Sequence, residues 1–344
     1  MTNMNLLIYG GYHQDYIYTN HLTEGISKNK NINTFPTFYK KEKNKFLRKK
    51  NHYFPPHFQI RNYVEEIILK NDITHILNYN TNHFSSNTIE YFKKKYNLKF
   101  CVYFNDSPFS YNLSKKIYYQ NQKKILNNYD YIFVYRNEDR DKIIKKYCYD
   151  EKSVKLLLPS CPEKKYLKHI KVSNKFLYDF AFIGHYEADG RIEVIRKLIN
   201  KGYSCLVIGH KWPEKKIDFF NTNSKILNKR LEYTEYLALI SSAYVNLGFV
   251  SKINNDIYTR RYFECPFSNS LFLAYESETY KNLNTNMPNI IFCKSKIPSI
   301  QDCLQALELA KLGLHYPNEE QKKNFYQNNC IYKRANIFSD FLNS

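Results

Sequence analysis

The 344-residue sequence lacks several patterns that would place it in a protein class at once. It contains no complete GxGxxG and no GxxxxGK[ST], so it has neither a dinucleotide fingerprint nor a P-loop. Its 8 cysteines form no CxxC pair, and no Cys/His cluster has zinc spacing. These absences favour reduced, mostly buried thiols over a structural metal site or a disulfide framework.

Long apolar segments are also missing. No apolar run reaches the roughly 18 residues of a membrane span. The N-terminal NLLIYGG is too short for the apolar region of a signal peptide and is followed by no cleavage site. We therefore expect a cytoplasmic protein, in which any membrane contact is peripheral and at the inner face of the membrane.

Basic residues, by contrast, are in excess. Lys and Arg number 52 against 32 Asp and Glu, which gives a formal net charge of +20. Such a field attracts phosphorylated small molecules, nucleic acid or acidic lipid headgroups. The basic, aromatic segment 38–58 is either a solvated loop or a docking surface for an anionic membrane, a polyanionic acceptor or nucleic acid. The residues that would dock are Lys40, Lys41, Lys45, Arg48, Lys49 and Lys50.

Strand and helix patterns alternate along the chain, which predicts an α/β protein with parallel sheets. The length suggests roughly two domains of about 150 residues each. We expect a first Rossmann-like domain over 1–160, a linker over 161–176, a second Rossmann-like domain over 177–325 and a C-terminal helix over 326–344 that crosses back to the first. The strands expected are 5–11, 74–80, 99–106, 129–135, 154–160, 178–185, 204–210, 244–250, 269–275 and 289–295.

Three glycine turns follow predicted strands, at Gly10-Gly11, Gly184 and Gly209. A glycine there lets backbone amides approach a phosphate, although turn glycines of any α/β protein look the same. The stretch TRRYFECPFSNSLFLAYES places Arg261 and Glu264 at the start of a short helix before a buried strand. A glutamate so placed can accept hydrogen bonds from a ribose diol and an arginine can neutralise a diphosphate. The alternative is a surface helix pair.

The order of these motifs resembles the donor-binding half of GT-B glycosyltransferases, in the group 1 and spore-maturation CgeB-like proteins. The resemblance rests on Phe182-Ile183-Gly184, Arg191, Gly209 and Arg261-Tyr262-Phe263-Glu264, and covers about residues 178–340. It implies two Rossmann-like domains whose parallel sheets face across a cleft. It also implies a nucleotide-diphosphate sugar as donor substrate, with no cofactor and no metal.

The same resemblance suggests which residues hold the donor. Glu264 would hold the ribose hydroxyls and Arg261 would face the diphosphate or the sugar. Asp256 precedes Glu264 by eight positions, with Asp where the family usually has Glu, and would face the sugar hydroxyls. The full set of expected donor-binding residues is Gly184, His185, Arg191, Gly209, His210, Asp256, Arg260, Arg261 and Glu264.

The catalytic base is less sharply indicated. An inverting enzyme needs a base beside the acceptor hydroxyl, and His13, Asp15 and Asp106 are the candidates, with His75 and His83 as further options. Each is also an ordinary residue for the end of a strand, and a retaining reaction needs no such base. The DxD of Asp139-Arg140-Asp141 would bind metal in a GT-A enzyme, but we predict that it forms the first turn of a helix.

These observations favour a glycosyltransferase that moves a sugar from a nucleotide-diphosphate sugar to a hydroxyl. The acceptor expected is a cell-surface glycan precursor, either lipid-linked or polysaccharide, or a protein. One alternative keeps the fold and makes DNA the acceptor, as in phage enzymes that glucosylate bases. Another is a non-catalytic protein that binds anions or nucleic acid on a degenerate GT-B scaffold.

Overall fold

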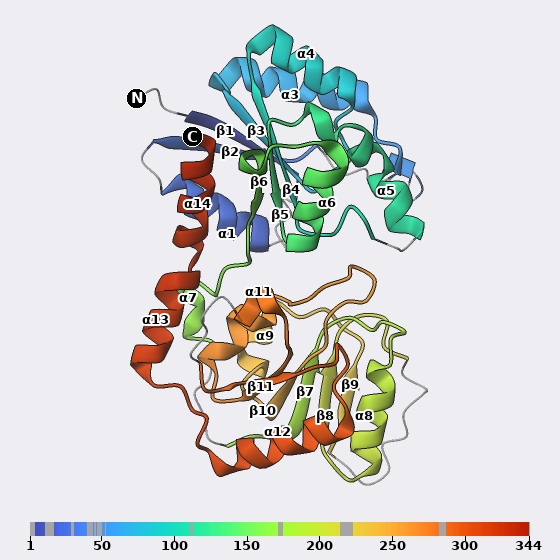
Figure 1. Ribbon diagram of the computed structural model, residues 1–344, viewed down its shortest axis with the longest axis vertical. Coiled ribbons are helices and arrows are strands. Elements are labelled where there is room, and N and C mark those ends of the chain that lie inside the picture. The colour runs from blue at the N-terminus through green and yellow to red at the C-terminus, as the bar shows by residue number, and fades with distance from the viewer. Residues whose placement is uncertain are drawn as a thin grey trace. The chain divides into compact units, whose positions relative to one another are not determined.

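The computed structural model describes residues 4–10, 17–28, 31–39, 44, 46, 50–51, 53–110, 113–170, 175–213, 223–281 and 287–343. The chain divides into two compact units, which are shown in Figure 1. Unit 1 consists of Met1–Leu158 together with Ile331–Ser344, and unit 2 consists of Pro159–Cys330. The segment expected to be a linker contains the short helix α7 (Lys164–Leu167) and belongs to unit 2.

Unit 1 is built on a six-stranded parallel sheet with the order β2-β1-β3-β4-β5-β6. Its first strand, MNLLIY, is buried on both faces, as expected for a parallel sheet covered by helices. Alternate residues point to opposite faces, so Leu7 and Tyr9 enter one core cluster while Leu6 and Ile8 enter the other. The strands are β1 (Met4–Tyr9), β2 (Ile32–Thr37), β3 (His75–Tyr79), β4 (Lys99–Phe104), β5 (Tyr131–Val134) and β6 (Val154–Leu156).

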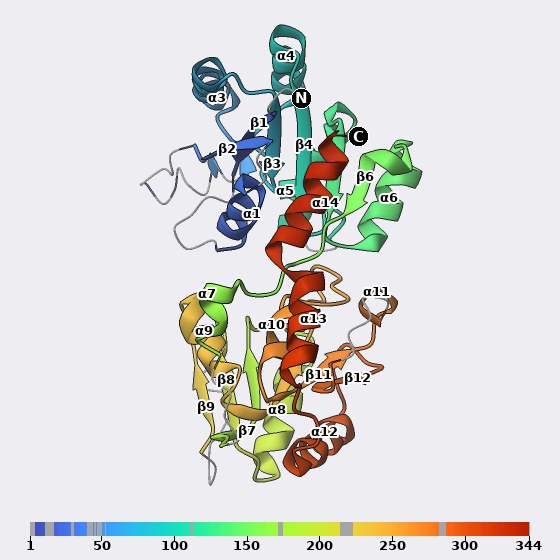
Figure 2. The same cartoon turned by 90° about the vertical axis from the view of Figure 1, so that its left-hand side faces the viewer.

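Helices cover both faces of this sheet. One face is packed by α3 (His57–Asn71), α4 (Ser86–Tyr96), α5 (Leu113–Lys124) and α6 (Asn137–Tyr147), which share a core cluster with the strands. The other face is packed by α1 (Ile17–Ser27) and the C-terminal helix α14 (Ile331–Asn343). Figures 1 and 2 both show α14 lying beside α1. The last helix of the chain is therefore part of the core of unit 1.

Unit 2 contains a second six-stranded parallel sheet, with the order β12-β11-β10-β7-β8-β9. Helices α8 (Arg191–Asn200) and α12 (Ile300–Leu312) pack on one face, and α9 (Tyr233–Leu239) lies against the small cluster on the other. The strands are β7 (Tyr178–Ile183), β8 (Cys205–Ile208), β9 (Lys225–Leu227), β10 (Ala243–Gly248), β11 (Leu271–Tyr275) and β12 (Ile290–Cys293). The remaining helices are α10 (Arg261–Glu264), α11 (Glu278–Lys281) and α13 (Glu319–Asn329).

The predicted α/β class with parallel sheets is confirmed, and all ten expected strands are present with shorter ends. Two strands were missed, β2 and β9, and both lie at the edge of a sheet. β2 is half-exposed and contains Pro36, while β9 has three residues with an exposed Lys225. An edge strand buries little and tolerates proline, so neither segment has the apolar run by which a strand is identified.

Two further expectations concern the state of the cysteines and the presence of a membrane-spanning helix. All 8 cysteines are free, and all except Cys148 are buried. Among the residues that the structure describes, no helix combines the length and apolar character that crossing a bilayer requires.

Candidate functional site at the carboxyl edge of the unit 2 sheet

The strand order of unit 2 identifies where a ligand would bind. From β7 the chain runs outward to β8 and β9, and it then returns to place β10 on the other side of β7. The crevice beyond the carboxyl ends of two such strands is where open α/β sheets bind ligands. The predicted donor-binding residues all follow the carboxyl end of β7, β8 or β10, with Arg191 opening α8. The structure therefore brings them to one edge of the sheet.

Arg191 is a buried clamp at this edge. Its Nε and Nη2 donate to the two carboxylate oxygens of Asp189, over 2.8 and 2.5 Å. Its Nη1 donates to the carbonyl of His185 over 2.6 Å, and Nη2 also reaches the carbonyl of Val250 at 3.4 Å. The side chains of Arg191 and Asp189 are each 3% exposed. These contacts join the loop after β7 to the loop after β10, and direct contact of Arg191 with a diphosphate stays a prediction.

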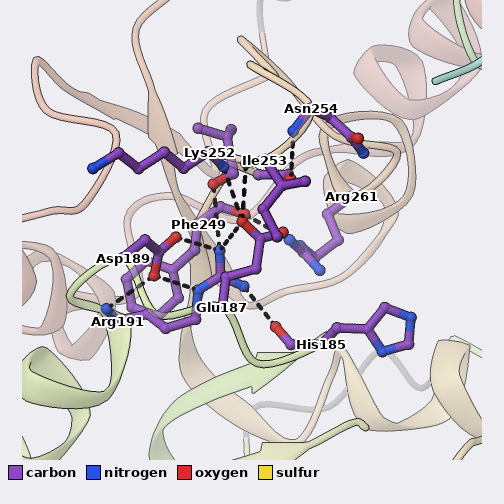
Figure 3. A network of polar contacts seen from close by, with 11 residues as sticks. His185, Glu187, Asp189, Arg191, Phe249, Lys252, Ile253, Asn254 and Arg261 are labelled. Carbon is purple, nitrogen blue, oxygen red and sulfur yellow. Dashed lines mark hydrogen bonds and ion pairs between the residues drawn. The ribbon is translucent and has the colours of Figure 1, made fainter. Parts of the chain in front are cut away.

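Glu187 extends the same network to Lys252 and Ile253 in the loop after β10 (Figure 3). One of its carboxylate oxygens accepts from the backbone N–H groups of Lys252 and Ile253, at 3.0 and 3.3 Å. The same oxygen lies 3.6 Å from Nη2 of Arg191. The two acids thus balance the charge of Arg191 and fix the 251–254 turn, since a backbone amide held by a carboxylate cannot easily reorient.

Arg261 makes a second connection between the same two strands. Its Nη1 donates to the carbonyl of Ile183 over 2.6 Å, and its Nη2 donates to the carbonyl of Phe249 over 2.8 Å. The guanidinium lies 4.8 Å from the ring centroid of Phe182, whose ring also has the Arg191 guanidinium within 5.5 Å. The Nε of Arg261 is buried and has no hydrogen-bond partner in the structure. Two cations are therefore held at the switch point, stabilised by one aromatic ring.

Close backbone approach at this edge depends on glycine. A methyl group on Gly209 would lie 2.5 Å from the carbonyl carbon of Gly184 and closer still to its oxygen. A methyl group on Gly184 would lie 2.9 Å from Nη1 of Arg261. The indole N–H of Trp212 donates to the carbonyl of Gly184 over 2.8 Å. The predicted glycine turns are thus required by packing of the two strand ends, and a phosphate contact there stays a prediction.

Two histidines mark the ends of β7 and β8. The imidazole rings of His185 and His210 are stacked, with centroids 5.5 Å apart, and both residues are exposed. Figure 3 shows the His185 ring directed away from the Arg191 network. Burial lowers the pKa of His185, and the positive charges of His210, Arg261 and Lys211 lower it further, against the opposing charge of Glu187. Positive groups therefore lie near His185 at this edge.

Glu264 is buried, with 1% of its surface exposed, which rules out the alternative of a surface helix pair. Its carboxylate accepts hydrogen bonds from Tyr233 and Tyr236, at 3.1 and 2.6 Å. It also accepts from Nε of Arg260 over 2.8 Å. The partner of Glu264 is thus Arg260 and not Arg261, because neighbouring residues on one helical turn project in different directions. Contact of Glu264 with a ribose stays a prediction.

Asp256 and the loop after Glu264 complete the edge. Asp256 is buried, and its N–H donates to the carbonyl of Ser251 over 2.8 Å. The segment 265–270 begins with a turn of 3-10 helix, Cys265–Phe267. The side-chain amide of Asn289 holds this segment, with its shortest contact, 2.8 Å, to the carbonyl of Ser268. This loop is therefore fixed by a buried asparagine that directly precedes β12.

The candidate bases of unit 1 are only partly described. His13 and Asp15 lie outside the described residues. Asp106 follows β4 and is half-buried, and its charge adds to the effect of burial in raising the pKa of Tyr119. His83 follows β3, and its Nδ1 lies 2.8 Å from the hydroxyl of Tyr9. His75 begins β3, at the opposite edge of the sheet from Asp106 and His83.

The DxD segment has the predicted form, because Asp139 lies in the first turn of α6. Asp139 is buried and accepts from the hydroxyl of Ser107 over 2.7 Å, and burial raises its pKa. Asp141 is exposed and lies 3.7 Å from Arg140. A search of the described residues finds no group of three or more His, Cys, Asp or Glu side chains arranged to hold a metal ion.

Of the six basic residues expected to dock, five lie outside the described residues: Lys40, Lys41, Lys45, Arg48 and Lys49. Lys50 is described and exposed. The same segment exposes three aromatic side chains, Phe46, Phe54 and Phe58. A docking role for the segment stays a prediction.

Comparisons with known proteins bear on the fold and on part of unit 2. Residues 191–317 match a protein-family profile described as glycosyl transferase-like. The UDP-GlcNAc 2-epimerase of Neisseria meningitidis, solved with UDP-GlcNAc bound, superposes with a TM-score of 0.60 at 11% identity, covering 98% of this chain and 99% of that one. A glycosyltransferase from Rickettsia africae superposes with a TM-score of 0.61 at 12% identity, covering 99% of each chain. The chain has the GT-B fold.

The family match encloses most of the site of this GT-B protein, from Arg191 to beyond Glu264. A structure of the putative UDP-N-acetylglucosamine 2-epimerase of Listeria monocytogenes is also similar, with a TM-score of 0.61 at 11% identity and 100% and 98% of the two chains covered. No curated protein sequence matches the chain. At these identities the solved structures establish the fold alone, and the more specific likeness to CgeB-like proteins stays a resemblance.

Several residues of the site were not foreseen from the sequence. Tyr233 and Tyr236 are three positions apart at the start of α9, a spacing that puts both on one side of a helix facing Glu264. Glu187 and Asp189 lie in the short loop before Arg191, where two acids so close to an arginine signal a local ion pair. Trp212, the only tryptophan in the sequence, was not predicted to belong to the site.

Proposed function

We propose that the protein transfers a sugar from a nucleotide-diphosphate sugar to a hydroxyl group of an acceptor. The observation that carries this proposal is the glycosyl transferase-like match over residues 191–317, which includes the clamp of Arg191 and the buried Glu264. The positive groups near His185 at the switch point of the sheet are consistent with a diphosphate ligand. We further propose that the acceptor is a cell-surface glycan precursor or a protein, as the family resemblance implies.

The diphosphate would lie against the carboxyl ends of β7 and β8. His185 is partly open to solvent there, and its pKa is lowered by partial burial and by the positive charges of His210, Arg261 and Lys211. A bound diphosphate would reverse that effect, because a nearby negative charge favours the protonated imidazole. His185 would then carry a proton in the complex and help to stabilise the charge that develops on the leaving nucleotide.

Arg261 and Arg191 would act mainly by holding the two strand ends in place. Each uses its guanidinium to bind backbone carbonyls from both sides of the switch point. Lysine cannot replace either one, since its single ammonium lacks the planar fork that spans two carbonyls. Precise positioning of this kind is a large part of catalysis in transfer reactions.

Glu264 would hold the nucleotide ribose through the capacity that remains on its second oxygen, which accepts from Tyr236 alone among the contacts described. A carboxylate oxygen has room for a second donor. Arg260, fixed by Glu264, would be the cation nearest to the ribose. For an inverting reaction the base would be His13, Asp15 or Asp106.

A second candidate is a change at the sugar without transfer. The UDP-GlcNAc 2-epimerases of two organisms superpose over nearly the whole chain. They share the scaffold, and the scaffold does not decide between transfer and epimerisation. The two reactions differ in what they need, because transfer requires an acceptor and releases the nucleoside diphosphate as its product.

The first experiment measures binding of UDP, GDP, CMP, ADP and dTDP to the full chain by thermal shift, with and without magnesium. A ligand that binds the folded state raises the melting temperature by mass action. The nucleotide that binds is then compared with its 2′,3′-dideoxy form, in wild type and in Glu264→Gln. If Glu264 holds the ribose, removal of the two hydroxyls weakens binding to wild type by about tenfold or more and has little effect on the variant.

Glu278→Gln, an exposed acid on α11, is the matched control. The corresponding nucleotide sugar is then incubated with and without acceptor mixtures, and both nucleoside diphosphate release and deuterium uptake into the sugar are followed. Deuterium uptake without acceptor would favour epimerisation. If none of these nucleotides binds and none of the corresponding nucleotide sugars is turned over, the proposal is wrong.

A further inference from the structure

Unit 1 carries a group of lysines on α5 and α6 that form no ion pair with the described residues. Helix α5 contains four lysines and no acid, and α6 carries three acids in its first five residues and three lysines beyond them (both green in Figure 1). We call Lys116, Lys123, Lys142 and Lys146 the α5–α6 lysine cluster. In the part of the chain that the structure describes, no carboxylate lies within 4.0 Å of their ammonium groups. The nearest acid along α6, Asp141, pairs instead with Arg140.

Two aromatic rings bring three of these lysines together. The ammonium groups of Lys123 and Lys142 lie 5.9 and 5.8 Å from the ring centroid of Phe109. The ammonium group of Lys146 lies 5.9 Å from the centroid of Tyr147, and the two rings are 6.4 Å apart. The aromatic faces hold the cations by cation–π attraction. Lysines from two helices therefore converge over one half-buried aromatic pair.

The positive charges within the cluster repel one another. Burial lowers the pKa of Lys123, and the positive charges of Lys146 and Lys116 lower it further. Lys142 also faces the buried Asp139 and helps to stabilise its charged form, but no acid contributes to the pKa of Lys123. A partly desolvated cation beside like charges is costly, and an anion bound between them would remove that cost.

We propose that the α5–α6 lysine cluster of unit 1 binds a phosphate-bearing ligand. Lys116, Lys142 and Lys146 are exposed, so a ligand can reach them. A phosphate group carries up to two charges and three acceptor oxygens, which suits several ammonium donors better than one carboxylate does.

The phosphate would be presented on a compact ligand rather than along a nucleic-acid strand. Single-stranded nucleic acid is bound by stacking bases on open aromatic faces. Here lysine ammonium groups lie over both rings, Phe109 and Tyr147. The phosphate can belong to a soluble molecule or to a lipid headgroup, and the chemistry that recognises it is the same.

The test uses the full chain and two probes. Tripolyphosphate binding is measured by calorimetry, and binding to phosphatidylcholine vesicles with and without phosphatidic acid is measured by co-sedimentation. Lys123→Ala/Lys146→Ala is compared with Lys70→Ala/Lys94→Ala, which removes the same charge from two exposed helical lysines of unit 1. We expect the cluster variant to bind one or both probes about tenfold more weakly or worse, and the control to bind within about twofold of wild type.

The thermal stability of the ligand-free variants separates this role from a structural one. Removing mutually repelling charges leaves the cluster variant as stable as wild type or more stable, whereas loss of a structural contact would destabilise it. Loss of tripolyphosphate binding alone assigns a soluble phosphate, and loss of phosphatidic acid binding assigns a headgroup. If the cluster variant binds both probes as wild type does, or if the control loses as much, the proposal is overturned. Binding of a single-stranded oligonucleotide in preference to both probes would also overturn it.

Discussion

The buried carboxylate of Glu264 allows the most exact test of the site. We consider Glu264→Gln, which keeps the shape of the side chain and removes its charge. In wild type the carboxylate accepts from Tyr233, Tyr236 and Arg260 at 3.1, 2.6 and 2.8 Å. In the variant one oxygen becomes an N–H₂ group, which cannot accept. The Arg260 guanidinium then loses its ion pair with Glu264 in a place where 14% of its side chain is exposed.

The size of the effect follows from these contacts. Removing one partner of a fully buried ion pair costs about 3–5 kcal/mol. Arg260 keeps some access to water, and a tyrosine hydroxyl can turn to accept from the new amide, so we expect about 2–3 kcal/mol. For a unit of this size that corresponds to a fall in Tm of about 4–12 °C. Tyr236→Phe, which removes one charge-assisted hydrogen bond, should cost about 1–2 kcal/mol.

The assay is urea unfolding of wild type, both single variants and the double variant, followed by fluorescence and circular dichroism. The double-mutant cycle should give a coupling of about 1–2 kcal/mol between Tyr236 and Glu264, since they share a hydrogen bond. Glu278→Gln, exposed and outside the cluster, should change stability by no more than about 0.5 kcal/mol. A Glu264→Gln protein as stable as the control, or a coupling near zero, would show that Glu264 is not held in this buried cluster.

Three further changes test the rest of the site. Gly209→Ala forces a methyl group against the backbone of Gly184 and should lower the free energy of unfolding in urea by about 3 kcal/mol. The control Gly202→Ala has open space around the new methyl group but a φ of +89°, and should cost about 1–2 kcal/mol. Equal costs for the two variants would contradict the packing argument. Asp189→Asn breaks the two-pronged pair with Arg191 and should cost about 3–5 kcal/mol by the same assay, and a neutral result would show that the clamp is not formed. Nucleoside diphosphate affinity, measured by calorimetry, should rise as the pH falls from about 8 to about 6, because the ligand favours protonated His185. The dependence of affinity on pH should be weaker in His185→Asn. An unchanged dependence in that variant would show that His185 is not part of the site.

Much of the fold was predictable because parallel strands buried on both faces are continuous apolar runs. Segments such as YDFAFI and CLVI stand out for that reason, and each ends in a glycine that close packing requires. The strands β2 and β9 could not be recognised in this way. Their positions at sheet edges come from the tertiary structure, which pairs them with a neighbour on one side only.

The sequence indicated which residues lie at the candidate site better than it indicated which groups their side chains contact. The sequence places Arg260, Arg261 and Glu264 together, but pairing depends on where each side chain points once the helix is docked. Arg260 turns to Glu264, while Arg261 turns to the carbonyls of Ile183 and Phe249. Backbone carbonyls leave no mark on a sequence, so an arginine that binds them cannot be told from one that binds a ligand.

The placement of α14 on α1 has a consequence for the order in which the chain folds during synthesis. Unit 2 is continuous from residue 159 to 330 and is complete before the last residues are made, while unit 1 is interrupted and is completed only by α14. Until then the apolar side chains of Leu22 and Ile26 lack the partners that Ile331 and Phe338 supply. The part of the protein made first is thus the last to be finished. A nascent chain whose α14 has not yet left the ribosome would present an open face on unit 1, which is the kind of surface that chaperones bind.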